Sequence, residues 1–294
     1  MSFGAKVLQQ RSELSFRSVR LRCLDEDRRP LRHASASGFV RIEEGVPFLY
    51  TCWHVVTGYD RNDLRVTNAL PKRAFLEVFL QGHLQAGPQS FTIPLYDGSA
   101  RPKKPLWYQD RAHLPHPDLN AIGLWVPSWH DAVKIPLPAD VQLSELQLVS
   151  NPVLTSNKLF STGDKIYVVG FPYRFSSDGV ALPTPIVLTR FVVATTVGGR
   201  PREFLLDSGG APGMSGGPVF VERQNDIALL GLYTGILYRD PAIERTRKVV
   251  ALGSCANLSL CWRGSLPLVR EPTEASKPAE VELKEQAQAA LRHA

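Results

Sequence analysis

APGMSGGPVF, residues 211–220, carries the strongest signal in this chain of 294 residues. An unactivated serine hydroxyl is a poor nucleophile, so it needs a neighbouring base and a tight turn that leaves its oxygen exposed. Gly213, Gly216 and Gly217 allow such a turn, because glycine tolerates backbone angles that other residues avoid. The segment therefore predicts Ser215 as a nucleophile, with the N–H groups of Gly213 and Ser215 directed at a carbonyl oxygen. An ordinary glycine-rich turn is the simpler interpretation of the same residues.

A candidate base follows an apolar segment in the first quarter of the chain. FLYTCWHVVTG, residues 48–58, places His54 immediately after a run that is typical of a buried strand. A base must be held firmly and still reach both a serine and a carboxylate, and a short turn or helix after a strand meets both needs. Any of the seven histidines can be structural, so the prediction for His54 depends on its combination with the serine segment.

A candidate carboxylate lies in HPDLNAIGLWV, residues 116–126. Asp118 precedes an apolar run that is typical of a strand, so it would accept a hydrogen bond from imidazole Nδ1–H at the strand's entrance. Asn120 is the competitor, because a register shift of two residues would put it in the same position. Five further aspartates lie in more polar or turn-like surroundings and are interpreted as surface residues: Asp60, Asp63, Asp97, Asp110 and Asp131.

Short strands dominate the rest of the chain, and helical periodicity is nearly absent before the C-terminal tail. The EEG turn predicts a hairpin between 37–42 and 46–52. The other predicted strands are 14–24, 76–81, 91–96, 120–126, 165–171, 185–197, 217–222, 227–238 and 248–253. This pattern predicts an all-β fold of two halves, with a boundary within 127–160. Periodicity alone fits both a long sandwich and a pair of barrels.

Composition excludes few classes of protein. A hydrophobic content of 44% and a charged content of 21% are ordinary for a globular protein. The arginines near the N-terminus, within residues 17–32, are interpreted as a solvated strand face, with an anionic partner as the alternative. A nucleic-acid-binding barrel is disfavoured, because no aromatic residues interleave with basic ones. No stretch resembles a signal peptide or approaches the roughly 18 apolar residues of a membrane span, so a cytoplasmic location is expected.

The four cysteines, Cys23, Cys52, Cys255 and Cys261, do not show the spacing of a metal site. Free, mostly buried thiols are expected, with a disulfide between Cys255 and Cys261 as the alternative in an oxidising compartment. We therefore expect no metal and no organic cofactor.

The last residues, 266–294, change character. A polar segment with prolines gives way to an apolar helical face, made by Leu283, Ala287, Ala290 and Leu291. A linker and a C-terminal helix docked on the preceding domain are expected, and a flexible tether or partner-binding helix is the alternative.

Four segments together resemble the trypsin-like (chymotrypsin-fold) serine peptidases: SGFV, TCWHVV, PDLNAIGL and PGMSGGPV. The resemblance is greatest to the bacterial branch with HtrA/Deg-type and glutamyl-endopeptidase-type catalytic domains. It covers roughly residues 14–265 and keeps the order His, Asp, Ser. It implies a peptidase domain over 1–265 made of two six-stranded antiparallel barrels, with the triad His54, Asp118 and Ser215 between them. The implied activity is that of a serine endopeptidase on proteins or peptides; the alternative is a catalytically silent domain that binds proteins.

The resemblance also implies a substrate pocket. Gly209 would lie near the pocket floor, and LLGLYTGI, residues 229–236, would pair with the substrate backbone. The residues along the pocket wall would be Tyr233, Thr234, Gly235 and Ile236. No acidic residue falls at the floor, so a small or medium apolar substrate residue is expected there. Met214 replaces an aspartate that digestive relatives use for activation, so control by a regulatory protein partner is expected instead.

Overall fold

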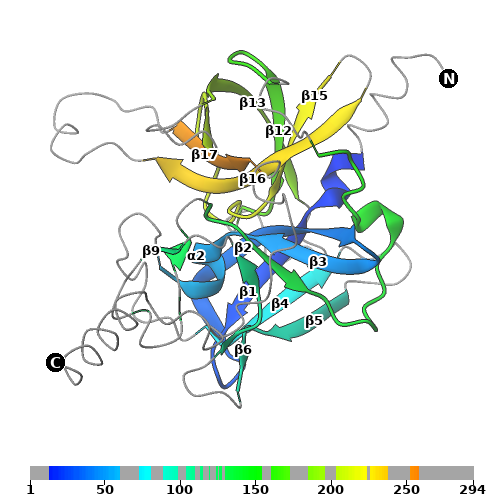
Figure 1. Cartoon of the computed structure of the whole chain (residues 1–294), viewed down its shortest axis with the longest axis vertical. Helices are drawn as coiled ribbons and strands as arrows, with labels where there is room; N and C mark the ends of the chain where they lie inside the picture. Colours follow the sequence, from blue (N-terminus) through cyan, green and yellow to red (C-terminus); the bar gives the residue numbers. More distant parts are fainter. Residues whose placement is uncertain are drawn as a thin grey trace, which may run out of the picture.

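Two antiparallel β-sheets, one after the other along the chain, contain nearly all the regular structure that is described (Figure 1). The structure is a computed structural model of the chain. It describes residues 13–59, 73–80, 89–98, 104–109, 113–114, 119, 124, 126–127, 130–153, 160–172, 185–195, 203–223, 226–237 and 252–257.

The first sheet has seven strands in the order β5-β4-β1-β2-β3-β11-β8. Its strands are β1 (Val19–Leu24), β2 (Pro30–Glu43), β3 (Val46–Thr51), β4 (Phe75–Leu80), β5 (Gln89–Pro94), β8 (Tyr108–Gln109) and β11 (Val133–Pro136). The predicted hairpin is confirmed as β2 and β3, which pair from Phe39 and Tyr50 to the turn. Glu44 and Gly45 make that turn with positive φ angles of 50° and 82°, the twist that two-residue hairpins prefer.

The second sheet is a closed six-stranded barrel in the order β12-β13-β14-β17-β16-β15. Its strands are β12 (Lys165–Gly170), β13 (Ile186–Ala194), β14 (Glu203–Leu206), β15 (Pro218–Glu222), β16 (Ile227–Leu237) and β17 (Leu252–Asn257). β12 is buried along almost its whole length, so its run of β-branched and aromatic residues packs on both faces. In Figure 1 this barrel lies above the first sheet.

Short elements complete the described part of the chain. They are η1 (Leu14–Arg17), α2 (Trp53–Thr57), η2 (Glu145–Gln147), and the two-residue strands β6 (Tyr96–Asp97), β7 (Lys104–Pro105), β9 (His113–Leu114) and β10 (Val126–Pro127). The chain passes from the first sheet to the barrel between Pro136 and Lys165. Among the described residues, no helix is long and apolar enough to cross a bilayer.

One hydrophobic cluster joins the two sheets. It contains side chains of the first sheet together with Trp53 of α2 and Trp107, which precedes β8, and it extends to Val169, Phe220 and Leu232 of the barrel. A second cluster fills the barrel itself around Phe204 and Met214. Because apolar side chains of both sheets share one packed core, groups placed at their junction are held in fixed positions.

The predicted all-β double-barrel architecture of the chymotrypsin type is confirmed. One detail differs from the prediction: the first sheet has seven strands instead of six, and only the second sheet closes within the described part of the chain. Of the predicted strand 120–126, Leu124 and Val126 lie within the described residues, and Val126 pairs with Leu114 of β9. The predicted C-terminal helix lies outside the described residues.

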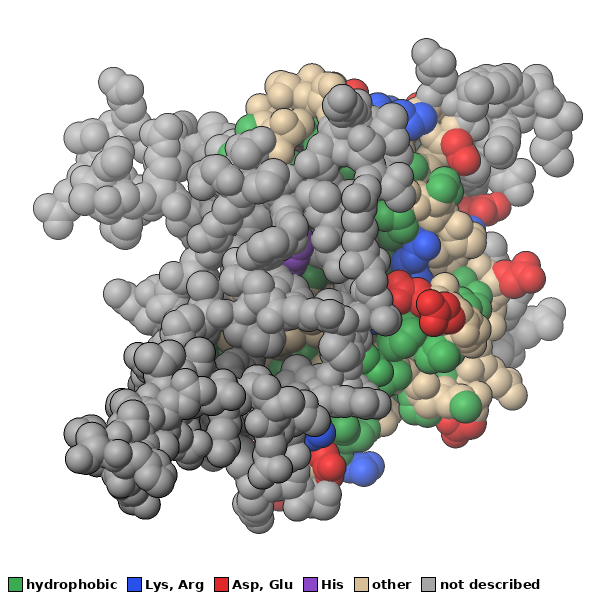
Figure 2. All heavy atoms as spheres, viewed as in Figure 1, with side chains coloured by type: hydrophobic (Ala, Val, Ile, Leu, Met, Phe, Trp, Pro, Cys, Tyr) green, Lys and Arg blue, Asp and Glu red, His purple; other side chains and the backbone are tan. Residues whose placement is uncertain are grey.

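Both signs of charge are interspersed on the described part of the face in Figure 2. Arg22, one of the N-terminal arginines, donates to Glu77 of the neighbouring strand at 2.7 Å. This pairing agrees with the interpretation of these arginines as a solvated strand face.

Candidate active site

His54 lies on the short helix α2, which begins two residues after β3 ends. Gly58 ends the helix in the left-handed conformation, with φ of 86°, and donates its N–H to the His54 carbonyl at 2.9 Å. The guanidinium of Arg73 donates to the same carbonyl at 2.8 Å and also to the carbonyl of Val55. A cation at the C-terminal end of a helix is favourable, so Gly58 and Arg73 together fix that end of the helix that carries His54.

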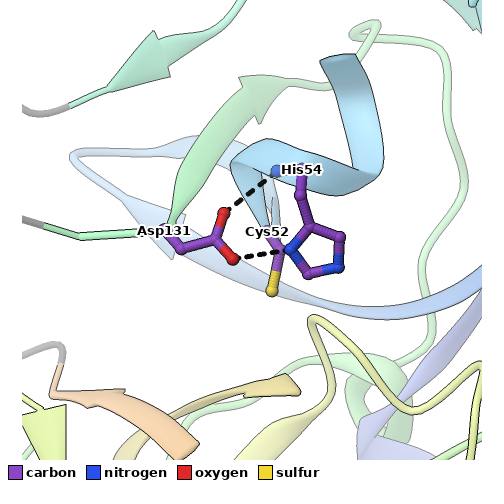
Figure 3. A group of neighbouring side chains, drawn as sticks. All are labelled: Cys52, His54 and Asp131. Carbon is purple, nitrogen blue, oxygen red and sulfur yellow. Dashed lines mark hydrogen bonds and ion pairs between the residues drawn. The ribbon is translucent and has the colours of Figure 1, made fainter. Parts of the chain in front are cut away.

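Asp131 holds the imidazole of His54 (Figure 3). The Nδ1 atom of His54 lies 2.6 Å from Oδ2 of Asp131, and Oδ1 of the same carboxylate accepts the His54 backbone N–H at 3.0 Å. The side chains are 26% and 13% exposed, respectively, so water competes little for the carboxylate. This geometry fixes the tautomer with its proton on Nδ1 and leaves Nε2 able to accept a proton.

The interpretation of Asp131 as a surface residue is therefore wrong. β11 pairs antiparallel with β3, and Val133 is opposite Thr51. Asp131 lies two residues before Val133, and Trp53 lies two residues after Thr51. Antiparallel pairing therefore brings Asp131 close to Trp53 and to its neighbour His54. This pairing could not be recognised in the sequence, because the segment SWHDAVKIP is partly polar and its strand has only four residues. The signal that could have revealed it is an aspartate just before an alternating apolar segment, the same criterion that selected Asp118.

Asp118 and its competitor Asn120 lie outside the described residues. The assignment of Asp118 to the triad stays a prediction. In the described part of the chain, the position next to His54 Nδ1 is taken by Asp131.

Ser215 lies on a tight turn directly before β15. Gly213 and Gly216 on either side of it have φ angles of 97° and 87°, which side chains rarely adopt. A Cβ atom at Gly216 would lie 2.3 Å from Thr51 Oγ1, so the turn packs directly on the end of β3. All three predicted glycines are thus needed. Gly213 and Gly216 are required for their backbone angles, and Gly216 and Gly217 for contact, since a Cβ at Gly217 would lie 2.1 Å from Val169 O.

Two backbone amides in this turn have no acceptor within the described part of the chain. In the part of the chain that the structure describes, the N–H groups of Gly213 and Ser215 donate no hydrogen bond. Their carbonyl groups are fixed by one residue of β2: Ser37 Oγ donates to Gly213 O at 2.8 Å, and Ser37 N–H donates to Ser215 O at 2.9 Å. This arrangement is compatible with the predicted oxyanion hole.

Ser37 is completely buried at the junction of the two sheets, with all its polar groups bonded. Its Oγ also accepts the N–H of Phe171 at 2.8 Å, and its carbonyl accepts Thr51 Oγ1–H at 2.9 Å. Sequence analysis included Ser37 only as part of the SGFV segment. Its role depends on four partners that are scattered along the chain.

Two contacts connect the serine turn to the histidine helix. The carbonyl of Tyr233 accepts the Gly216 N–H at 2.7 Å and lies 3.3 Å from Cys52 Sγ, which donates to it. Thr51 packs on Gly216 as described above. Residues adjacent to Ser215 and His54 therefore meet, although no hydrogen bond among the described residues joins the two side chains themselves.

The predicted pocket residues lie around the same turn. Tyr233 is 1% exposed, and its hydroxyl accepts the N–H of Gly210 at 2.7 Å, so its ring supports the pocket segment from inside the barrel. The carbonyl of Gly209 accepts from Arg190 at 3.3 Å. The remaining predicted residues, Thr234, Gly235 and Ile236, lie on β16.

Comparison with known proteins gives limited information. No protein-family model and no curated protein sequence matches this chain. Among solved structures, the chain is similar to the HtrA-type protease AlgW, solved with a tripeptide, with a TM-score of 0.46 and 15% sequence identity. The alignment covers 89% of this chain and 61% of that chain, so this chain spans less than two thirds of its length. The fold itself is defined by its strand topology, a seven-stranded sheet followed by a closed six-stranded barrel.

Proposed function

We propose that this chain is a serine endopeptidase that hydrolyses peptide bonds in proteins or peptides through an acyl-enzyme. The proposed triad is Ser215, His54 and Asp131, with Asp131 in place of the predicted Asp118. The observation that carries the proposal is the 2.6 Å contact between His54 Nδ1 and Asp131 Oδ2. A carboxylate in this position keeps the base in one tautomer and stabilises the imidazolium that forms during reaction.

In the proposed mechanism, Ser215 Oγ attacks the substrate carbonyl carbon while His54 Nε2 takes the hydroxyl proton. The tetrahedral intermediate then collapses, the carbon–nitrogen bond breaks, and His54 gives the proton to the leaving amine. A water molecule next attacks the acyl-enzyme, and His54 accepts its proton and returns it to Ser215. Protons balance over the cycle, and no cofactor enters any step.

The negative oxygen of each intermediate would be held by the N–H groups of Gly213 and Ser215. Support comes from their lack of other acceptors in the described structure, because a donor already in use could not stabilise new charge. Fixed donors of this kind are worth about 10²- to 10³-fold in kcat each.

The substrate would add a strand to the edge of β16. Pairing of β16 with β15 ends at Leu232, whereas pairing with β17 continues through Gly235 to Leu237. An extended peptide is the ligand that fits such an edge, since backbone hydrogen bonds provide affinity and side-chain pockets provide selectivity. This edge favours peptides over simple esters as substrates.

The proposal is tested by labelling with a fluorophosphonate probe, which reacts with an activated serine. Wild-type protein should be labelled, and the Ser215→Ala variant should not. Equal labelling of the two proteins would contradict the assignment of Ser215. Mapping of new N-termini in a proteome treated with each protein would then identify substrates and any requirement for a regulatory partner.

The second candidate function is a silent domain of the same fold that binds proteins. It is favoured by one observation, the lack of a hydrogen bond between Ser215 and His54 among the described residues. Contacts of this kind are often long before substrate binds, so we place this function second. It predicts that neither wild-type protein nor any variant is labelled by the probe. The cytoplasmic location stays a prediction.

A further inference from the structure

Three side chains with different metal-binding chemistry meet at His54 (Figure 3). They are a thiol, an imidazole and a carboxylate, from Cys52, His54 and Asp131, and one ligand atom from each lies within 4.8 Å of the other two. In Figure 3 Cys52 Sγ lies beside the Asp131 carboxylate and the His54 ring, and its S–H donates to the Tyr233 carbonyl at 3.3 Å. The proposed hydrolysis uses His54 and Asp131 and gives the thiol no role.

We propose that Cys52, His54 and Asp131 form an inhibitory binding site for Zn²⁺. The binding itself requires only these three side chains, whereas its regulatory meaning rests on the proposed function. In the bound state, Cys52 Sγ, His54 Nδ1 and Asp131 Oδ2 are the protein ligands, and water completes the four-coordinate shell that zinc prefers. The thiol proton is released to solvent, and the imidazole proton moves from Nδ1 to Nε2, so His54 stays neutral and one proton leaves for each zinc ion bound.

Distances allow this arrangement after a small rearrangement. Two nitrogen or oxygen ligands at about 2.0 Å from a tetrahedral zinc ion lie about 3.3 Å apart, and a sulfur ligand lies slightly farther away. The observed 2.6 Å between Nδ1 and Oδ2 must therefore open, and the sulfur must approach, each by roughly an ångström. Asp131 Oδ1 can keep its bond to the His54 N–H, which would orient the carboxylate as an outer-shell partner does.

Charge balance favours occupancy of a site that is this enclosed. Cys52 is completely buried, and the Asp131 side chain is 13% exposed. A thiolate and a carboxylate together cancel the two positive charges of the zinc ion, so no net charge is buried. A thiolate with an imidazole also selects Zn²⁺ over Mg²⁺ and Ca²⁺, which prefer sets of oxygen ligands.

Inhibition follows from the chemistry of imidazole. A neutral imidazole that binds zinc through Nδ1 carries its proton on Nε2. His54 could then not accept the proton of Ser215, and Asp131 could no longer hold the catalytic tautomer. A single zinc ion would thus disable the base without touching the serine.

Direct metal binding tests the site independently of catalysis. The full chain with Ser215→Ala is titrated with Co²⁺, a spectroscopic substitute for Zn²⁺, and the near-ultraviolet absorption from sulfur to cobalt is recorded. The matched variants are Cys52→Ala and Cys23→Ala. Both thiols are buried and donate to a backbone carbonyl at 3.3 Å, but only Cys52 belongs to the cluster.

The absorption should appear with the parent protein and with Cys23→Ala, disappear with Cys52→Ala, and be displaced by Zn²⁺ but not by Mg²⁺. Absence of the band in the parent protein would overturn the proposal, and so would its persistence in Cys52→Ala, because another thiol would then be the ligand. Zn²⁺ should also inhibit peptide hydrolysis by the chain with an intact Ser215 at least tenfold more strongly than it inhibits the Cys52→Ala variant. Binding without any hydrolysis would refute the proposed function and keep the site, whereas hydrolysis without binding would do the reverse.

Discussion

Replacing Ser37 with alanine removes one oxygen atom that serves two buried backbone groups. Gly213 O loses the donor at 2.8 Å, and the N–H of Phe171 loses its acceptor at the same distance. The Ser37 N–H to Ser215 O bond remains, because the backbone is unchanged. A buried polar group without a partner costs about 1–3 kcal/mol, so two such groups should lower the free energy of unfolding by about 2–6 kcal/mol.

Ser37→Ala should also slow peptide hydrolysis, and this loss of activity tests the proposed role of Ser37 more directly than the loss of stability does. Gly213 has a φ of 97°, a conformation that glycine leaves easily once its carbonyl is released. If its peptide turns, one proposed oxyanion donor is lost, which lowers kcat by about 10²-fold. KM should change little, because the donor acts on charge that develops only in the transition state.

The assay is peptide hydrolysis measured below the unfolding transition, with fluorophosphonate labelling as a second readout. Ser18→Ala is the control: Ser18 is equally buried and donates to Gly38 O at 3.1 Å, away from the serine turn. It should lose stability and keep its kcat. A Ser37→Ala protein that is folded and hydrolyses peptides within twofold of wild type would refute the reasoning.

Three further predictions concern the triad, the turn and the pocket. Asp131→Asn should lower kcat by about 10⁴-fold through the wrong tautomer of His54, as in other triads, while Asp118→Asn leaves it nearly unchanged; the opposite ranking in steady-state assays would restore Asp118. Gly216→Ala should destabilise the fold by about 3 kcal/mol or more, because the new Cβ would lie 2.2 Å from Ser37 O. Gly163→Ala, with φ of 92° and open space around it, should cost only the strain of about 1–2 kcal/mol, and equal losses in thermal unfolding would show that contact is unimportant. Because the Arg190 guanidinium reaches Gly209 O, peptide-library profiles should include acidic residues beside the expected apolar ones, and Arg190→Gln should remove the acidic part; an unchanged profile would exclude Arg190 from the pocket.

The candidate site could be predicted in part. Ser215 and His54 could be identified because the residues next to them carry the signal. Glycines beside Ser215 permit a tight turn, and an apolar strand ends just before His54. The carboxylate that pairs with His54 could not be identified in this way, because it depends on which distant strand pairs with β3 and in which register. Asp131 lies 77 residues from His54 in sequence and reaches it because β11 pairs with β3, and several aspartates preceded plausible strands.

The same distinction applies to the fold. Alternation of apolar residues and the Glu44–Gly45 turn determined the β2–β3 hairpin locally, since a hairpin's register follows from its turn. Closure of the second barrel depends on pairing between β14 and β17, which are distant in the chain. The strands β8 and β11 of the first sheet were not predicted, because strands of two and four residues leave little periodic signal.

The sequence by itself thus determined the all-β class, the serine turn and the histidine helix, because each depends on neighbouring residues whose conformational preferences act over a few positions. The tertiary structure alone decided that Asp131 faces His54, that Ser37 fixes the carbonyls of Gly213 and Ser215, and that Cys52 Sγ lies close to both His54 and Asp131. The physical reason is that these contacts join segments from different strands. Their geometry is set by sheet pairing and by the shared core between the two sheets, which no local pattern encodes.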